Sequence, residues 1–247
     1  MKRTLIIFGV ILSLTFNISA TTWFPAQHKC PVCKKKNIYQ EIGSYGSYIY
    51  SWPSKYQYIY WPLTDLPSVY SCINCHFSSY LWDFDNIPKN KIDTLKKFLT
   101  QTKLDKKYKD YLDIPMTRRL EIAESVYKIL GRDTQFWCEF YRVIGYHYDQ
   151  VKDSIKAKEA RLKAIDLARF ILLDSMYIGQ EKENLYIIAA MNNFTGHKDS
   201  ALIYLDKASS LTYSNLKWEK KDVDNHDEYL TDLIKQYKEF ISKKDEE

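Results

Sequence analysis

The chain has 247 residues, of which 45% are hydrophobic and 27% are charged, with a formal net charge of +5. This length accommodates one medium-sized domain or two small ones. The basic excess is too small and too dispersed along the sequence for a nucleic-acid-binding surface. The seven glycines form neither a dinucleotide fingerprint nor a phosphate loop, and the sequence contains no H-E-x-x-H zinc-protease motif.

Residues 1–20 have the pattern of a removable signal peptide. Lys2 and Arg3 precede an apolar run from Leu5 to Phe16, and Asn17–Ala20 ends on a small residue suited to cleavage. The apolar run is short for a membrane span, although a retained anchor helix is the alternative. We therefore expect an exported protein, periplasmic or secreted, with no stable membrane span after cleavage.

Two cysteine pairs organise the region of residues 21–88. Cys30 and Cys33 form the first C-x-x-C pair, and Cys72 and Cys75 form the second. Two such turns far apart in the chain are typical of a zinc ribbon, in which four thiolates hold one structural Zn²⁺. So small a region needs a stabilising cross-link of this kind. The sequence predicts a zinc-ribbon-like, aromatic-rich module with Zn²⁺ bound by these four cysteines.

Other chemistries compete for the same cysteines. Disulfides are an alternative in an oxidising compartment, and thiol–disulfide exchange would use one pair. Cys72, Cys75 and His76 spell the C-x-x-C-H string of c-type haem attachment, although that reading leaves the first pair unexplained. A zinc hydrolase would use fewer than four cysteines and recruit a histidine, such as His28 or His76. A closed four-cysteine site leaves no position for a substrate water and favours a structural role.

Glycine often follows the second cysteine of such a turn, but Lys34 and His76 stand there.

The segment between the pairs is rich in tyrosine and tryptophan. Period-two alternation predicts a strand at Tyr56–Tyr60, and a second strand at Val69–Cys72 enters the second pair. We interpret the aromatic residues as packing for a thin sheet, although a glycan, peptide or protein patch is the alternative. These residues are Tyr39, Tyr45, Tyr48, Tyr50, Trp52, Tyr56, Tyr58, Tyr60 and Trp61.

The region of residues 89–247 has helical periodicity. We expect helices from Lys91, over about Leu120–Leu130 up to Gly131, and over Thr134–Gln150. Further helices are expected over Ser154–Tyr177, as a pair split at Gly196, and over His226–Ile241. Two helix pairs carry small and apolar residues at the spacings of a tetratricopeptide (TPR) unit, offset by 44 residues. The first set is Tyr141, Gly145, Tyr148, Ala157 and Ala164, and the second is Leu185, Ala189, Ala201, Leu205 and Ala208.

A repeated tripeptide suggests a competing offset of 46, since Lys152–Ser154 recurs as Lys198–Ser200.

Cys138 lies between aromatic residues and is expected to be a buried, inert thiol rather than an intermolecular cross-link. Asp83 and Asp85 are interpreted as a solvated turn, with paired catalytic carboxylates as the alternative. Residues 245–247 are expected to form a solvated tail.

The mature chain resembles the DUF2225 family of uncharacterised bacterial proteins over about residues 29–212. The matching stretches are Cys30–Cys33, Tyr70–Ser78, Arg119–Ala123 and Asn184–Ala189. His76 stands where the family usually has glycine, so the haem-like string is interpreted as accidental. The resemblance implies a zinc-ribbon-like head followed by TPR-like helices, and it implies no activity.

Together these features predict an α+β, mostly α protein: a zinc-ribbon-like β module followed by irregular TPR-like helical repeats. We expect an exported non-enzymatic scaffold that binds a protein or peptide partner through the repeats. The alternatives are a redox protein and, less favoured, a zinc hydrolase. Because head and helices are expected to have separate cores, replacing Cys30 or Cys72 by serine should destabilise the head alone.

Overall fold

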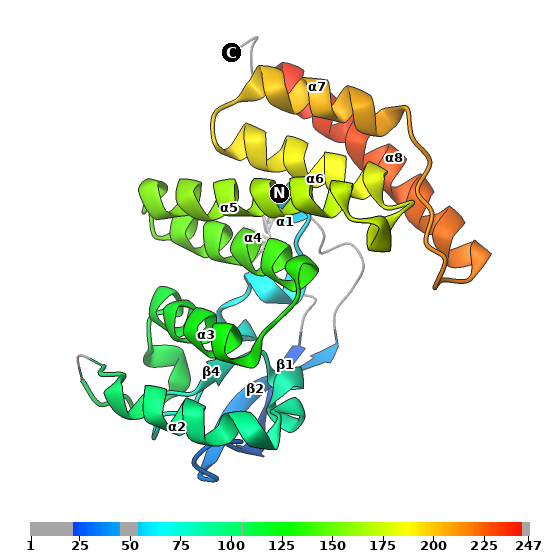
Figure 1. Cartoon of the computed structure of the whole chain (residues 1–247). Helices are drawn as coiled ribbons and strands as arrows, with labels where there is room; N and C mark the ends of the chain where they lie inside the picture. The colour runs from blue at the N-terminus through cyan, green and yellow to red at the C-terminus, as the bar shows by residue number, and fades with distance from the viewer. Residues whose placement is uncertain (1–21, 45–53, 105, 244–247) are drawn as a thin grey trace, which may run out of the picture.

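The computed structural model describes residues 22–44, 54–104 and 106–243, and shows an α+β, mostly α protein. The predicted signal peptide and the C-terminal tail lie outside these residues. Figure 1 shows the β strands and α2 (Ile92–Gln101) at one end of the molecule. The helices α6 (Glu181–Phe194), α7 (Lys198–Ser209) and α8 (Lys220–Lys243) lie at the other end. No helix in the described ranges combines the length and apolar character needed to cross a membrane.

Two antiparallel β-hairpins form the head. Strands β1 (Thr22–Lys29) and β2 (Lys36–Ser44) pair so that Lys29 faces Lys36, and the first cysteine pair occupies the turn between them. Strands β3 (Tyr70–Ser71) and β4 (Ser78–Ser79) flank the second pair in the same way. The predicted strand entering the second pair is therefore confirmed.

The predicted strand at Tyr56–Tyr60 is wrong, because its first two residues belong to α1 (Ser54–Gln57) and Tyr58 then turns with a φ of 53°. Residues 54–61, the inserted segment, lie against the helical body instead of in a sheet. The hydroxyl of Tyr186 donates to the Tyr56 carbonyl at 3.0 Å, and the ring of Tyr56 stacks on Tyr237 at 4.7 Å. Contacts with helices more than 100 residues away determine this conformation, so the local alternation is misleading.

The long helices follow the predicted pattern closely. Helix α3 (Met116–Leu130) ends at Gly131, whose φ of 77° provides the left-handed cap. The predicted long helix is shorter than expected, since α5 ends at Leu173 and a 3₁₀ turn covers Ser175–Tyr177. The remaining helices are α2 (Ile92–Gln101), α4 (Thr134–Gln150), α5 (Ser154–Leu173), α6 (Glu181–Phe194), α7 (Lys198–Ser209) and α8 (Lys220–Lys243). Further 3₁₀ turns lie at Trp61–Thr64, Leu66–Ser68, Leu81–Asn86, Lys89–Lys91 and Tyr111–Asp113.

Helices α4 and α5 form one packed pair, and α6 and α7 form the next. The small residues named above are all buried. A Cβ atom on Gly145 would lie 3.3 Å from the Ala157 carbonyl oxygen, so glycine permits this close approach. Asp153 caps α5 and His197 precedes α7, which supports the offset of 44 residues rather than 46.

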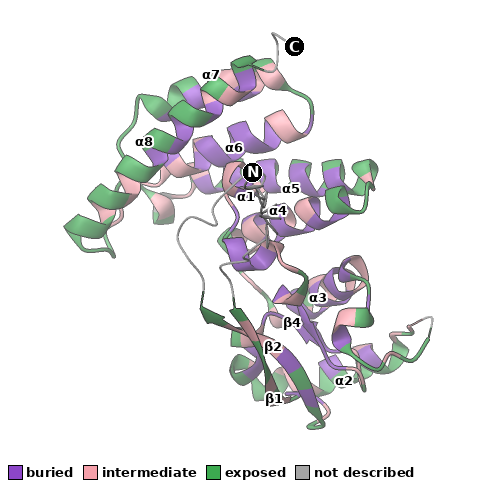
Figure 2. Cartoon of the chain, turned by 180° about the vertical axis from the view of Figure 1, so that it is seen from behind, coloured by how far each residue is buried: buried purple, intermediate pink, exposed green. Residues whose placement is uncertain are grey.

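One buried cluster joins the head to the helices α2 and α3, and Figure 2 shows buried segments in both regions. The cluster that contains Cys30, Cys72 and Tyr39 also contains Leu95 of α2 and Val126 of α3. The expectation of separate cores is therefore wrong. The physical reason is that two short hairpins enclose too little apolar surface by themselves and bury it against α2 and α3. The domain boundary near residue 88 stays a prediction, and buried residues on both sides of it share one cluster.

Candidate metal centre

Each cysteine pair lies in a tight turn closed by two backbone hydrogen bonds. The Cys30 amide donates to the Lys35 carbonyl at 2.9 Å, and the Lys34 amide donates to the Cys30 carbonyl at 3.0 Å. The second turn repeats this pattern, with bonds from Cys72 to Phe77 and from His76 to Cys72, both at 2.8 Å. Two chemically equivalent turns thus present their cysteines to each other.

Lys34 and His76 take the place that glycine often has in such a turn. Their φ angles are 64° and 65°, both in the left-handed region. A residue with a Cβ atom is strained there, and only a strong local constraint holds it. The departure from glycine noted in the sequence therefore leaves the turn geometry unchanged.

The four predicted ligands converge in space. The Sγ atoms of Cys30 and Cys75 lie 3.5 Å apart, as do those of Cys33 and Cys72, and all four Sγ atoms lie within 4.8 Å of one another. A tetrahedral site with Zn–S bonds of about 2.3 Å has sulfur atoms about 3.8 Å apart. All four cysteines are free thiols. The donor set and its spacing fit one tetrahedral metal ion.

The electrostatics of the cluster favour a bound cation. Hydrogen bonds from the thiols of Cys30 and Cys75 lower the pKa of Cys72 well below its usual range. The same hydrogen bonds raise the pKa values of Cys30 and Cys75, and the pKa of Cys30 reaches about 12. Thiolates this close repel one another, so a divalent cation is needed before all four ionise.

Asn37 links the two turns and was missed by the sequence reasoning. Its Nδ2 donates to the Cys72 sulfur at 3.5 Å, and its Oδ1 accepts from the Ile73 amide at 3.2 Å. Such a residue orients a ligand and adjusts its charge. The available signal was the alternation along β2, where Asn37 and Tyr39 share the buried face.

The centre is enclosed on one side by aromatic residues. Tyr39 is fully buried and packs edge-on against Tyr70, Phe84 and Tyr111, with centroids 5.0–5.5 Å apart. Burial raises the pKa of Tyr39 far above its usual range, so the phenol stays neutral. The sulfur cluster therefore faces a neutral, largely apolar wall.

The two candidate histidines lie outside the set of four. His28 forms an ion pair with Glu41 and stacks on Tyr39, with centroids 6.0 Å apart. His76 is half-buried, and burial lowers its pKa. Among the described residues, only the four cysteines bring three or more metal-ligating side chains together.

The other candidate groups have structural roles. The interpretation of Asp83 as part of a solvated turn is wrong, because it is buried, accepts from Tyr127 Oη at 2.7 Å and forms an ion pair with Arg132. Its partners come from α3 and the loop that follows, which the local sequence does not reveal. Asp85 is exposed and does not join it. Cys138 is buried as predicted, and burial raises its pKa.

Comparison with known proteins adds no assignment: the chain matches no protein-family model, no curated protein and no solved structure. The resemblance to DUF2225 therefore stays a prediction.

Proposed function

We propose that this is an exported, non-enzymatic scaffold protein, with a structural Zn²⁺ in the head and a helical body that docks a protein partner. The observation that carries the proposal is the convergence of four thiols from two equivalent turns. Four protein ligands complete the coordination of Zn²⁺ and leave no position for a substrate. Cys30 and Cys72 are fully buried, which further suits a structural ion.

The competing chemistries account for less of this geometry. Haem attachment at Cys72, Cys75 and His76 would use only the second pair, whereas both pairs face a common centre. A hydrolase would need a histidine among the ligands, and neither His28 nor His76 belongs to the cluster. Zn²⁺ suits four soft sulfur donors and needs no redox partner.

Short repeat arrays commonly bind an extended peptide on the face formed by the first helix of each pair, which here is the face of α4, α6 and α8. The inserted segment covers that face. The partner is therefore proposed to dock elsewhere on the helical body. An exposed alternative lies around Met176 and Trp218, which line one hollow of about 320 Å³. These side chains are 70% and 44% exposed, and Ile178 and Leu216 beside them are also exposed. Methionine and tryptophan are enriched at protein interfaces.

The metal half of the proposal is tested by the metal content and visible spectrum of protein purified under reducing conditions. We expect one zinc per chain and no absorption beyond the aromatic band. A Soret band, or a redox-active metal in place of zinc, would contradict a structural zinc. Cysteine pairs that cycle between the thiol and the disulfide form in the native protein would contradict it as well.

The scaffold half is tested in the cells that make the protein. A photo-crosslinking amino acid at Met176 should give one discrete adduct in the exported fraction. Substitution of Trp218 by alanine should abolish that adduct, whereas a crosslinker at Lys97, which is exposed on α2, should give none. Equal adducts from both positions, or an adduct that is unchanged in Trp218→Ala, would contradict docking at this hollow. Protein retained in the cytoplasm with residues 1–20 intact would contradict export.

A further inference from the structure

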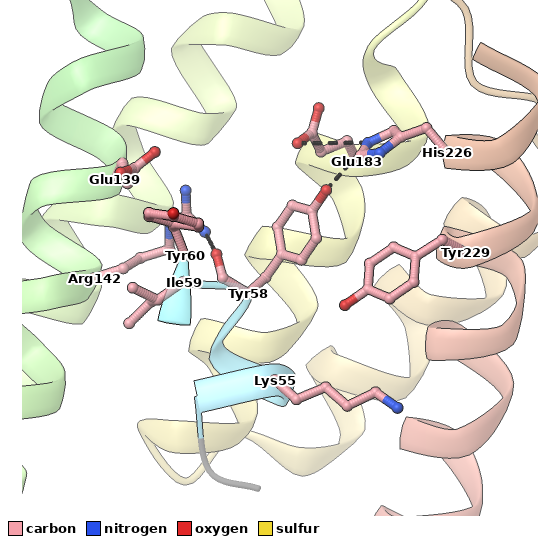
Figure 3. A pocket seen from close by; sticks show the side chains of 9 residues that line it. All are labelled: Lys55, Tyr58, Ile59, Tyr60, Glu139, Arg142, Glu183, His226 and Tyr229. Carbon is pink, nitrogen blue, oxygen red and sulfur yellow. Dashed lines mark hydrogen bonds and ion pairs between the residues drawn. The ribbon is translucent and has the colours of Figure 1, made fainter. Parts of the chain in front are cut away.

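A second cavity, of about 410 Å³, lies between the inserted segment and the helices α4, α6 and α8 (Figure 3). It contains none of the four clustered cysteines, and Glu183 is the one lining residue that it shares with the hollow around Met176. Its lining residues are Lys55, Tyr58, Ile59, Tyr60, Glu139, Arg142, Glu183, His226 and Tyr229. Four separate stretches of the chain thus contribute polar and aromatic groups to one hollow.

Two carboxylates line this cavity without a permanent cationic partner. Within the described ranges, Glu139 forms no hydrogen bond or ion pair. Among the described residues, Glu183 forms an ion pair only with His226, at 3.9 Å between Oε1 and Nε2, and the phenol oxygen of Tyr58 is hydrogen-bonded to the same Nε2 at 3.1 Å. Burial lowers the pKa of His226, so its imidazole is neutral near pH 7. Among the described residues, no permanently charged cation therefore contacts either carboxylate.

The two basic side chains at the cavity are engaged with neutral groups. Arg142 donates through Nη1 to the Tyr58 carbonyl and through Nε to the Cys138 carbonyl. Lys55 donates through Nζ to Gln236 Oε1 at 2.8 Å. Neither pairs with Glu139 or Glu183. Burial raises the pKa of Glu183, whereas Tyr58 and Arg142 act in the opposite direction.

Aromatic rings complete the environment. The rings of Tyr58 and Tyr229 are roughly parallel, with centroids 6.5 Å apart, and Tyr60 lines the cavity from the inserted segment. Figure 3 shows the Tyr58 phenol directed toward Glu183 and His226. The faces of tyrosine rings attract organic cations, most strongly where water is excluded.

A metal ion does not fit this arrangement. Among the described residues, no three metal-ligating groups other than the cysteines lie close enough to share an ion. Glu183 and His226 lie 3.9 Å apart, but Glu139 does not join them in a set of three ligands. That spacing suits a larger cation, whose charged head contacts a carboxylate and whose body contacts the rings.

We propose that this cavity binds an organic ammonium ion, with Glu183 and Glu139 neutralising its charge and the tyrosine rings holding its carbon skeleton. An ammonium group makes charge-assisted hydrogen bonds to carboxylates. Ile59 and the tyrosines provide the apolar wall that such ligand sites usually have. The source of the ammonium group is either a free amine or a lysine side chain of another protein.

The proposal is tested by calorimetric titration of the mature protein with three probes that differ in one group. These are 2-phenylethylamine, which is a cation at pH 7, its neutral analogue 2-phenylethanol, and the anion 3-phenylpropionate. We expect the amine to bind at least tenfold more tightly than either analogue. Nα-acetyl-lysine methylamide is the fourth probe: binding tighter than that of 2-phenylethylamine assigns the site to protein lysines, and weaker binding assigns it to free amines.

The variants Glu183→Gln and Glu139→Gln should each weaken binding of the amine about tenfold. Glu139→Gln removes no hydrogen bond, so its fold should be intact even if Glu183→Gln proves unstable. Glu228→Gln is the matched control, because Glu228 is exposed on α8 and does not line the cavity. The proposal is overturned if the neutral analogue binds as tightly as the amine, if no ammonium probe binds, or if Glu139→Gln behaves like the control.

Discussion

The guanidinium of Arg119 donates a 2.6 Å hydrogen bond to the carbonyl of Val69, and so joins α3 to the strand that enters the second cysteine pair. Arg119 is fully buried, and its Nε also donates to the Ile114 carbonyl at 3.1 Å. The ring of Tyr111 lies 5.4 Å from the guanidinium carbon. The four-cysteine cluster and α3 are therefore joined by polar bonds as well as by a common core.

Substitution of Arg119 by methionine should lower the free energy of unfolding by about 3 kcal/mol. The side chain keeps most of its volume, but the carbonyls of Val69 and Ile114 lose their buried donors. Urea denaturation followed by circular dichroism measures the change. Arg118→Met is the matched control, since Arg118 is half-exposed and pairs with Glu121, and its loss should cost less than about 1 kcal/mol. Equal effects of the two variants would contradict the role given to Arg119.

Substitution of Lys34 by glycine should raise the free energy of unfolding by about 1 kcal/mol. Lys34 is exposed and has a φ of 64°, so glycine removes backbone strain without removing packing. Lys34→Val should have the opposite effect, because a branched Cβ is least tolerated there. Lys35→Gly is the control, since Lys35 has no positive φ and gains nothing. Denaturation is measured with zinc present, and a destabilised Lys34→Gly would refute the left-handed turn.

Substitution of Asn37 by alanine should weaken zinc binding about 10- to 100-fold. The change removes the donor to the Cys72 sulfur and the acceptor for the Ile73 amide, so the ligand is less well oriented. Competition with a chromogenic zinc chelator measures the affinity. Asn74→Ala is the control, because Asn74 is exposed within the second turn and its backbone amide is retained. Unchanged affinity in Asn37→Ala would show that this residue has no influence on the metal.

His147 should make the protein less stable in mild acid. Burial lowers its pKa to about 4, and its Nε2 donates to the Leu63 carbonyl at 2.9 Å. Its contribution is present above the unfolded pKa of about 6.5 and is lost as the pH falls toward 4, because the unfolded chain binds the proton more tightly. The full effect is about 3 kcal/mol. We expect the drop in stability between pH 7 and pH 4.5 to be smaller in His147→Gln, and an identical pH profile would contradict this account.

The sequence was most informative where local chemistry determines structure. The four-cysteine cluster followed from ligand spacing, and the bounds of α4 followed from helical periodicity. The small residues of the helix pairs, such as Gly145, were identified because close helix packing demands them. These features depend on residues within one turn or one helix pair.

The sequence was least informative where distant segments meet. Tyr56 alternates with polar neighbours like a strand residue, yet its ring lies on Tyr237 of α8. Asp83 resembles a turn residue, yet Tyr127 and Arg132 bury it. The cavity around Glu183 likewise needs four segments that no local pattern relates. In each case tertiary contacts override the local preference.

Substitution of Cys72 by serine should abolish metal binding and also reduce helical content. Cys72 lies in the buried cluster that includes Leu95 of α2 and Val126 of α3, so a disordered head uncovers both helices. Circular dichroism at 222 nm during thermal unfolding measures this coupling. Cys138→Ser is the control, since Cys138 is buried in the helical body away from the cluster, and it should keep the metal. Loss of the metal with unchanged helical melting would show that the two regions fold separately.

The most direct test of the central claim is native mass spectrometry of the protein, purified without added metal, beside its Cys72→Ser variant. We predict that the wild-type chain carries one zinc ion and that the variant carries none. A wild-type chain with no metal, or a variant that retains one zinc ion, would contradict a four-thiolate centre.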